Sequence, residues 1–231
     1  MNQLKHLAVI LDGNRRFAKR LMLEPWKGHE FGKKKVEELI EWCIESGIKE
    51  LTLYSFSMQN FNRPKEEFNY LMKLIKDAFT EFESDDRVSK YRIKLNVIGR
   101  YELFPDDVVE IMNKVQEKTK NNSGFIINFA MAYGGREEII DGIKKLIQSE
   151  PHISSNISNI DESLFSKYLY LQSEPDLIIR TGGDRRTSNF LPWQSIYSEL
   201  LFLEKSWPEF TKEDFTNALD DFNNRERRFG K

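Results

Sequence analysis

The sequence predicts an α/β fold in which a mostly parallel central sheet of about six strands is flanked by helices. Short apolar runs alternate with segments whose apolar residues recur at helical spacing, and these helical segments are long enough to cross between parallel strands. With 231 residues, of which 39 % are hydrophobic, the chain can bury one sizeable core. We therefore expect a single domain over residues 1–231.

Six short apolar runs have the character of strands in a parallel sheet, which are buried on both faces. They are residues 6–12, 48–56, 93–98, 125–131, 176–180 and 200–203. The first run ends in a carboxylate, Asp12, and the fifth ends in Arg180. Ligands of such sheets bind beyond the carboxyl ends of the strands, so the polar residues after each run are the candidate functional residues.

Helical periodicity connects these runs. The predicted helices are residues 33–46, 68–82, 108–115, 139–147, about 164–169 and a last helix that begins near Thr211. Gly47 follows the first helix, where glycine commonly ends a helix. Asp214, three residues after Thr211, is an acidic capping partner. The Ser- and Asn-rich residues 151–161 predict a loop.

The composition excludes several classes of protein. Cys43 is the only cysteine, which excludes an internal disulfide and a thiolate-cluster metal site. The chain has 35 basic and 37 acidic residues, so it has no general attraction for nucleic acid, and an anion site must be local. The apolar run near the N-terminus is far shorter than the about 20 residues of a spanning helix. We expect a cytoplasmic protein with at most peripheral membrane contact.

The first strand end continues as Asp12-Gly13-Asn14-Arg15-Arg16 and then as a helix. Backbone N–H groups at a helix start, together with two guanidinium groups, form a cradle for a diphosphate, and Asp12 could hold a metal against it. The same residues are also good turn formers, and Asp12 could simply cap the helix.

The second strand end, residues 55–64, interleaves polar and aromatic side chains. Ser57 and Asn60 alternate with Phe56 and Phe61, as expected of a site that binds a charged head and an apolar tail. A polar loop held by two aromatic side chains, with Pro64 opening the next helix, is an equally good interpretation.

The third strand end is rich in arginine. Arg180, Arg186 and Ser188 lie in a segment that also contains two glycines, which suits close binding of a phosphate. A solvated basic loop is the alternative. Glu199, farther along, could join Asp12 in holding a cation. His29 beside Lys27 could contact phosphate, although a lone histidine is more often structural.

Together these segments resemble the undecaprenyl diphosphate synthase family, the cis-prenyltransferases, over nearly the whole chain. The matching residues are Asp12-Gly13-Asn14-x-Arg16-x-Ala18, Gly28-His29-x-x-Gly32, Phe56-Ser57-x-x-Asn60-x-x-Arg63-Pro64, Tyr133-Gly134-Gly135-Arg136, Arg180–Gln194, Glu199, Trp207-Pro208 and Arg225–Gly230. Several motifs in this order are far more specific than any one of them.

The resemblance implies an enzyme that condenses isopentenyl diphosphate in successive cis additions onto an allylic diphosphate primer. In that family Mg²⁺ is the cofactor, and Asp12 would position it. The allylic diphosphate would bind residues of the first motif and two others: Gly13, Asn14, Arg15, Arg16, Phe17, His29 and Arg63. His29 matches a position implicated in diphosphate departure, and Ser57 and Asn60 match positions at the condensing carbons.

The resemblance also assigns the second substrate and a partner. Arg180, Arg186 and Ser188 would bind the diphosphate of isopentenyl diphosphate, and Glu199 would contribute to the metal site. Arg228 and Gly230 match a C-terminal motif that reaches the phosphate site of a partner subunit, so a homodimer is implied. The family fold surrounds a hydrophobic tunnel, in which each added CH₂ gains about 0.8 kcal/mol on burial.

Some residues depart from the family pattern. Gln59 replaces a common Glu, and Phe17 and Phe61 replace Trp, which leaves product length and substrate preference open. The segment after Phe190 favours the archaeal branch, where the primer is geranylgeranyl rather than farnesyl diphosphate. The acceptor of the released proton also stays open between a side chain and a diphosphate oxygen.

Three other functions fit the sequence less well. A trans-prenyltransferase carries DDxxD motifs, and the chain has none. A non-catalytic subunit of a heteromeric enzyme loses the first motif and the arginine-rich segment, and both are intact. A nucleotide- or RNA-binding function is not supported, because the sequence has no P-loop pattern and no excess of basic residues.

Overall fold

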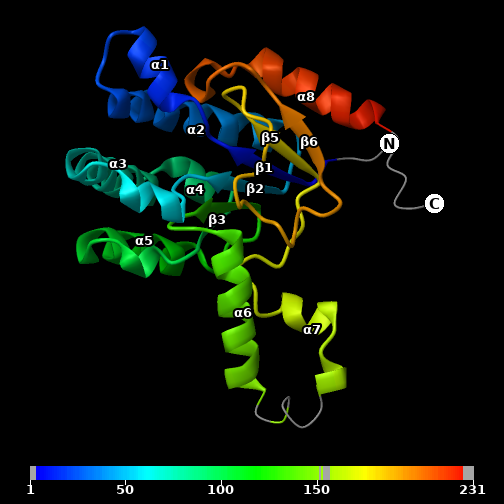
Figure 1. Cartoon of the computed structure of the whole chain (residues 1–231). Coiled ribbons are helices and arrows are strands. Elements are labelled where there is room, and N and C mark those ends of the chain that lie inside the picture. The colour runs from blue at the N-terminus through cyan, green and yellow to red at the C-terminus, as the bar shows by residue number, and fades with distance from the viewer. Residues whose placement is uncertain (1–3, 151, 153–156, 226–231) are drawn as a thin grey trace.

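The core of the protein is a six-stranded sheet (Figure 1). The structure is a computed structural model, which describes residues 4–150, 152 and 157–225. Its strands are β1 (His6–Ile10), β2 (Glu50–Tyr54), β3 (Ile93–Ile98), β4 (Phe125–Ala130), β5 (Leu177–Arg180) and β6 (Glu199–Phe202). Their order is β3-β4-β2-β1-β5-β6, and every neighbouring pair is parallel. The predicted α/β fold is confirmed.

The helices follow the predicted order. They are α1 (Asn14–Arg20), α2 (Gly28–Glu45), α3 (Lys65–Glu83), α4 (Asp86–Lys90), α5 (Asp106–Thr119), α6 (Gly135–Ser149), α7 (Glu162–Ser166) and α8 (Lys212–Asn224). The predicted caps are present at two ends. Gly47 takes a left-handed backbone after α2, with φ of 76°. The Thr211 side chain accepts a bond from the Asp214 N–H while the Asp214 carboxylate accepts from the Thr211 N–H.

One face of the sheet carries most of the helices. Alternate residues of β1 and β2, such as Leu7 and Leu53, pack against buried side chains of α2 and α8. Residues of β3, including Leu95, pack against α3 and α5. The opposite face packs against the chain segments around Leu171 and Phe190. This division follows from the pleat, since successive side chains of a strand point to opposite faces.

A row of polar side chains crosses the second face from β3 to β1. Asn96 donates to Asn128 at 2.8 Å, Asn128 donates to Thr52 at 3.0 Å, and the Thr52 hydroxyl pairs with His6 at 2.7 Å. Asn128, Thr52 and His6 are buried. Burial lowers the pKa of His6, although the nearby Glu50 and Asp176 act in the opposite direction. The row therefore links four neighbouring strands through hydrogen bonds of their side chains.

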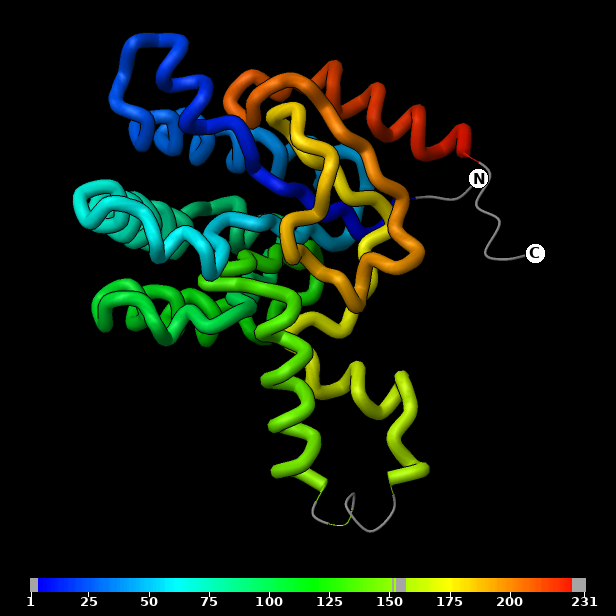
Figure 2. Tube along the Cα trace, viewed as in Figure 1, coloured from blue at the N-terminus to red at the C-terminus, as the bar shows by residue number. Residues whose placement is uncertain are grey.

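An arm formed by α6 and α7 extends from the body, as the chain trace shows (Figure 2). Gly142 of α6 allows close contact with α7, because a Cβ at this position would lie 3.2 Å from the ring of Phe165. On the other side of α6, Ile140, Ile143 and Ile147 are exposed at helical spacing. The arm thus presents an apolar stripe to its surroundings. None of the described helices has the length and apolar character needed to cross a membrane.

Candidate active site

A pocket of about 410 Å³ opens at the carboxyl edge of the sheet. Its polar end is lined by residues from three strand ends and from the starts of two helices: Asp12, Asn14, His29, Ser57, Asn60, Arg63 and Arg180. A smaller hollow adjoins it and adds Gly13, Arg15 and Arg16. The structure therefore brings together most of the predicted site residues, as expected where parallel strands end at one edge.

The rest of the pocket is apolar. It runs between α2 and α3 over the surface of β3 and β4, and its apolar lining includes Val36, Ile40, Leu71, Leu74, Ile75, Ala78, Phe79, Leu95 and Phe129. The predicted apolar faces of the helices at residues 33–46 and 68–82 thus form a pocket wall as well as core, whereas that of residues 108–115 packs in the core alone. A pocket with a charged end and a long apolar bed suits a ligand with a charged head and a hydrocarbon tail.

The turn after β1 requires glycine. Gly13 has φ of 102°, and a Cβ there would lie 2.7 Å from the Cα of Ser206. The N–H of Trp207 donates to the carbonyl oxygen of Asp12 at 2.9 Å, and the Asn14 amide donates to the Leu11 carbonyl at 2.9 Å. The first motif is therefore held against the segment around Trp207, and its Asp12 side chain is left to face the pocket.

Two arginines keep Asp12 ionised. Arg180 donates to one carboxylate oxygen at 2.8 Å, the Gly13 N–H donates to the other at 2.6 Å, and Arg16 lies 3.3 Å from it. Burial alone would raise the pKa of Asp12, but the Arg180 hydrogen bond and the charges of Arg180 and Arg16 outweigh it and lower the pKa below its usual value. Asp12 is therefore an anion at neutral pH.

Arg180 joins the first and third strand ends. Its guanidinium is buried and donates to the Ser188 hydroxyl at 2.7 Å and to the Arg186 carbonyl at 2.5 Å, besides Asp12. The exposed Arg186 side chain pairs with Asp184 at 2.9 Å. Arg180 therefore shapes the loop, while Arg186 and Ser188 are exposed at its surface, where a second anion could reach them.

The arginine-rich loop also docks on the start of α6. Asn189 has a left-handed backbone, with φ of 65°, and its side chain accepts a bond from the Arg136 N–H at 2.9 Å. The carbonyl of Asn189 accepts from Gly135 at 2.8 Å, and a Cβ on Gly135 would lie 2.0 Å from Pro192. Gly135 of the Tyr133–Arg136 motif is thus needed for this close approach.

A second charged group surrounds His29. Arg63 donates to His29 Nε2 at 3.2 Å and to Glu67 at 2.5 Å, and Arg15 lies 3.5 Å from the other oxygen of Glu67. Glu67 is only 1 % exposed, so this buried carboxylate orients both arginines toward the pocket. Burial, together with the positive charges of Arg63 and Arg15, lowers the pKa of His29 to about 3. His29 is therefore neutral and accepts a hydrogen bond from Arg63.

We expect the His29 imidazole to stay neutral down to about pH 3 in the ligand-free protein. Replacing Arg63 by Ala removes the nearest positive charge and raises the His29 pKa, and bound inorganic diphosphate raises it too because its negative charge favours imidazolium. A titration followed by NMR measures both changes, and a His29→Gln variant assigns the signal. A ligand-free pKa near 6.5 would contradict the geometry.

Ser57 and Asn60 are fixed by a local turn. The Ser57 N–H donates to the Asn60 side-chain oxygen at 2.8 Å at the start of a short 3₁₀ helix, Met58–Asn62. The N–H of Met58 donates to the Tyr133 carbonyl at 3.0 Å, which ties this loop to the segment after β4. Both residues line the pocket beside the charged groups.

Glu199 lies at the other end of the sheet. It begins β6, pairs with Leu177, which in turn pairs with Leu7, and its carboxylate accepts a bond from Arg225 at 2.7 Å. Five residues separate Leu7 from Asp12, or about 16 Å along a strand at about 3.3 Å per residue. Within one chain Glu199 and Asp12 cannot share a cation, which corrects the expectation that they do.

The remaining predicted residues have mixed outcomes. Phe17 packs edge-on against Phe31, with ring centroids 5.2 Å apart, and does not line the pocket. Arg228 and Gly230 lie outside the described residues. Two acids were missed as site residues: Glu67, which orients Arg63, and Asp184, which pairs with Arg186. The spacing of Arg63 and Glu67, four residues apart at a helix start, was the available signal for the first.

Asp12 is the residue best suited to hold a divalent cation. Mg²⁺ commonly takes one or two protein carboxylates and completes its shell with substrate phosphates and waters. Asp12 is ionised and faces the pocket, and Asp184 lies on the other side of Arg180, 3.4 Å from it. In the described part of the chain no group of three or more His, Cys, Asp or Glu could enclose a metal. The residues present therefore fit a cation shared between Asp12 and a bound diphosphate.

Comparisons with known proteins identify relatives of this chain. A family model described as "Putative undecaprenyl diphosphate synthase" matches residues 10–230. The chain is 47 % identical over 229 residues to the tritrans,polycis-undecaprenyl-diphosphate synthase (geranylgeranyl-diphosphate specific) of Pyrococcus abyssi, covering 98 % of this chain and 87 % of the relative. The enzyme of the same name from Thermoplasma volcanium is 46 % identical, with 98 % and 89 % covered.

Two solved structures share the fold. Lavandulyl diphosphate synthase from Lavandula x intermedia, in complex with dimethylallyl diphosphate, matches with a TM-score of 0.91 and 31 % identity over 99 % of both chains. A probable undecaprenyl diphosphate synthase from Campylobacter jejuni matches with a TM-score of 0.83 and 35 % identity over the whole of both chains.

The fold, the charged pocket end and these comparisons define the class of enzyme as the prenyltransferases. Within that class, the chain belongs to the undecaprenyl diphosphate synthase family, the cis-prenyltransferases that condense isopentenyl diphosphate with an allylic diphosphate. The family resemblance predicted from the sequence is confirmed.

Proposed function

We propose that this enzyme extends geranylgeranyl diphosphate with isopentenyl diphosphate to a long polyprenyl diphosphate such as undecaprenyl diphosphate. The observation that carries the proposal is the single pocket that joins an arginine-rich end to an apolar bed between α2 and α3. The choice of primer follows the archaeal relatives, whose names specify geranylgeranyl diphosphate. The single domain over residues 1–231 carries the whole reaction apart from what a second copy contributes.

In this proposal the allylic diphosphate binds at the first strand end. Arg16 and Arg63 neutralise it from two sides, and Asn14 offers its backbone N–H group at the start of α1, while Gly13 lets the chain turn closely beside the diphosphate. Its hydrocarbon tail lies in the apolar pocket. Mg²⁺, held by Asp12, would supply further positive charge to the leaving diphosphate. Glu67 keeps Arg63 in place, so little reorganisation is needed when charge builds up on the leaving group.

Isopentenyl diphosphate binds on the other side of Asp12. Arg180 holds the loop in shape, and Arg186 and Ser188 contact the diphosphate. Asp184, which now pairs with Arg186, releases that guanidinium when the more strongly charged diphosphate arrives. The site holds the double bond of isopentenyl diphosphate beside the allylic carbon, which makes the condensation effectively unimolecular. This positioning accounts for a large share of the catalysis.

The proton released from isopentenyl diphosphate goes to a diphosphate oxygen. The nearby side chains are poor bases: His29 Nε2 accepts a bond from Arg63, Asp12 is held by two arginines, and Ser57 and Asn60 are neutral. Ser57 and Asn60 position the condensing carbons instead. His29 supports departure of the allylic diphosphate by holding Arg63, through the 3.2 Å bond between them.

The reaction is tested by supplying the purified protein with Mg²⁺, labelled isopentenyl diphosphate and, in parallel, geranyl, farnesyl or geranylgeranyl diphosphate. We expect a metal-dependent ladder of products that ends at a long chain and is most efficient from geranylgeranyl diphosphate. A preference for farnesyl diphosphate would overturn the primer assignment. No incorporation by folded protein from any primer would contradict the proposal and point to a non-catalytic subunit.

The Arg186→Ala variant separates the two diphosphate sites. We expect its KM for isopentenyl diphosphate to rise about 10- to 100-fold, because a hydrogen bond to a charged group contributes about 1.5–3 kcal/mol. The KM for the allylic primer should stay nearly constant. Steady-state kinetics with each substrate varied in turn measure both. A selective rise in the primer KM would show that the two sites are reversed.

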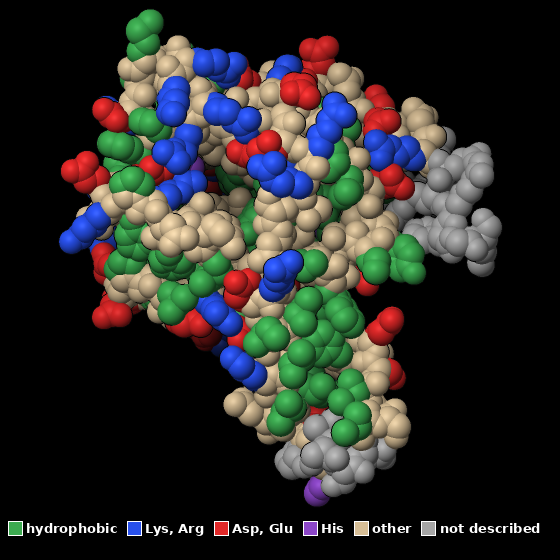
Figure 3. All heavy atoms as spheres, viewed as in Figure 1, with side chains coloured by type: hydrophobic (Ala, Val, Ile, Leu, Met, Phe, Trp, Pro, Cys, Tyr) green, Lys and Arg blue, Asp and Glu red, His purple; other side chains and the backbone are tan. Residues whose placement is uncertain are grey.

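We also propose that two copies form a homodimer through the arm and the edge of the sheet. Apolar side chains gather over the arm in the space-filling view (Figure 3), and Ile143 and Ile147 are 41 % and 59 % exposed. Ile196, just before the edge strand β6, is 72 % exposed. Exposed apolar side chains of this kind are typical of a permanent interface. It also leaves Glu199, at this edge, available to a neighbouring copy.

If the protein is a homodimer, light scattering should give the molar mass of two chains. An Ile143→Lys/Ile147→Lys double variant should shift the protein to one chain, since two buried charges would face the partner without partners of their own. Leu103→Lys, at another exposed apolar position, is the control and should stay dimeric. A wild-type protein of one chain, or a double variant that remains dimeric, would contradict this interface.

A further inference from the structure

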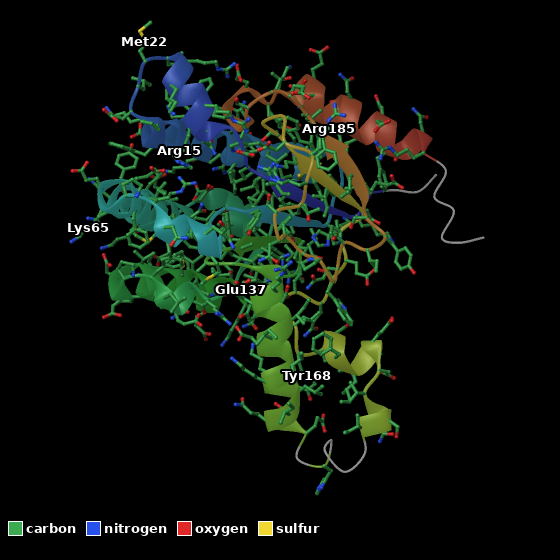
Figure 4. The ribbon with its side chains drawn as sticks, in the orientation of Figure 1. Arg15, Met22, Lys65, Glu137, Tyr168 and Arg185 are labelled. Atoms are coloured by element: carbon green, nitrogen blue, oxygen red, sulfur yellow. The ribbon has the colours of Figure 1, made fainter. Side chains whose placement is uncertain are left out.

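The turn after α1 presents three consecutive apolar side chains to solvent. Leu21, Met22 and Leu23 are 49 %, 95 % and 37 % exposed. Figure 4 shows Met22 at the outermost tip of this turn, pointing away from the body of the protein. Single exposed apolar side chains are common on protein surfaces, but three in succession at a projecting tip are not.

The turn is ordered by its own hydrogen bonds. The N–H of Met22 donates to the Lys19 carbonyl at 3.1 Å, and the N–H of Leu23 donates to the Ala18 carbonyl at 3.0 Å. This pair of bonds is the Schellman motif, in which the residue at the position of Met22 takes a left-handed backbone and is usually glycine. Met22 has φ of 56°. A bulky residue is unfavourable in this backbone and gains no burial here, so folding alone does not account for it.

Positive charge surrounds the tip. Residues 15–35 contain eight basic and two acidic residues, although the whole chain has a net charge of −2. Lys19, Lys27 and Lys34 are exposed and make no ion pair with any other described residue. In Figure 3 lysine and arginine side chains gather on the same upper part of the molecule. Trp26, partly buried, follows the tip in the 3₁₀ helix Pro25–Lys27.

The tip belongs to the same element that walls the diphosphate hollow. Arg15, Arg16 and Lys19 of α1 line that hollow, and Met22 comes three residues after Lys19. An apolar tip among basic residues fits a surface that is apolar inside and negatively charged outside. Such a surface is a bilayer that contains anionic lipids.

We propose that the apolar tip Leu21–Leu23 inserts into an anionic lipid bilayer while the surrounding lysines bind its headgroups, so that the mouth of the diphosphate site faces the membrane. The proposal rests on the proposed function in one respect, which is that a long polyprenyl product must pass from the apolar pocket to a lipid phase. The binding itself requires no turnover, so its test is independent of the reaction.

The test is sedimentation of the purified protein with vesicles of phosphatidylcholine alone or with phosphatidylglycerol added. We expect binding to the anionic vesicles that weakens as salt is raised, and little binding to the neutral ones. Met22→Gly should weaken binding about tenfold, because the side chain that inserts is lost. This variant should fold at least as well as the wild type, since glycine suits the backbone of residue 22.

Two further variants complete the experiment. Lys27→Glu/Lys34→Glu should remove the preference for anionic vesicles, whereas Leu103→Ser, at an exposed apolar position outside the tip, should bind as the wild type does. Turnover in detergent should be the same for Met22→Gly and the wild type. Equal vesicle binding by Met22→Gly and the wild type would overturn insertion of the tip. If the wild type failed to bind anionic vesicles, the proposal that this surface binds a membrane would be contradicted, whatever the outcome of the prenyl transfer assay.

Discussion

Replacing Asp12 by Asn is expected to lower kcat by roughly 10²–10³-fold or more, since it removes a carboxylate at the polar end of the pocket that Arg180 and Arg16 keep ionised. The neutral amide has nearly the same shape, so the turn at Gly13 and the packing of Trp207 should remain. Single-turnover kinetics at saturating Mg²⁺ measure the loss. Near-normal activity would contradict the role of Asp12.

The same variant also has a predictable effect on stability. The folded-state pKa of Asp12 is below its ordinary value, so the ionised group stabilises the fold above that ordinary value, and this stabilisation is lost as the pH falls through the folded-state pKa. The melting temperature of Asp12→Asn should therefore be modestly lower than that of the wild type at pH 7, and the difference should shrink at acidic pH. Asp141→Asn is the matched control, because Asp141 also pairs with an arginine, Arg100, at 2.8 Å, but does not line the pocket. It should keep its activity.

Replacing Ala78 by Phe is expected to shorten the products. Ala78 lines the apolar pocket from α3, thirteen residues after the first residue of that helix, or about 20 Å at about 1.5 Å per residue. A ring there fills the space that the end of a growing chain needs, whereas the diphosphate end is untouched. The first condensation should change by less than about twofold, as expected for a distant site.

Chromatography of the product ladder measures this change. Wild-type protein should end at a long chain and Ala78→Phe several five-carbon units earlier. Asp77→Phe is the control, because Asp77 is the neighbouring residue but is exposed and does not line the pocket. Its ladder should match that of the wild type. An unchanged ladder in Ala78→Phe would show that the growing chain does not occupy the space between α2 and α3.

Much of the candidate site could be predicted because it follows from the parallel sheet. Asp12 and Asn60 come soon after a strand and Arg180 is the last residue of one, and the carboxyl ends of parallel strands meet at one edge. The same rule did not help with Glu199, which begins its strand rather than following one. Its place depends on the register of β6 against β5, where it pairs with Leu177. Alternation of polar and apolar residues does not determine that register.

The contacts between helices were beyond prediction. The pairing of His29 with Arg63 depends on how the starts of α2 and α3 approach each other, and a sequence pattern does not contain that geometry. Glu67 looks like an ordinary acid in the first turn of a helix, yet it is buried. The strongly lowered pKa of His29 follows from its burial and from the positive charges of Arg63 and Arg15, so it also became visible only in the structure.

The polar row through the second face of the sheet bears on how the chain avoids misassembly. β1, β2, β3 and β4 are short and apolar, so a slipped pairing would still bury hydrocarbon. It would, however, separate Asn96, Asn128 and Thr52 from one another and deprive the buried Asn128 and Thr52 side chains of these hydrogen bonds. An unsatisfied buried polar group costs about 1–3 kcal/mol, so each slip carries its own penalty. The hydrogen bonds of the row therefore favour the native strand register over slipped registers that would bury as much apolar surface.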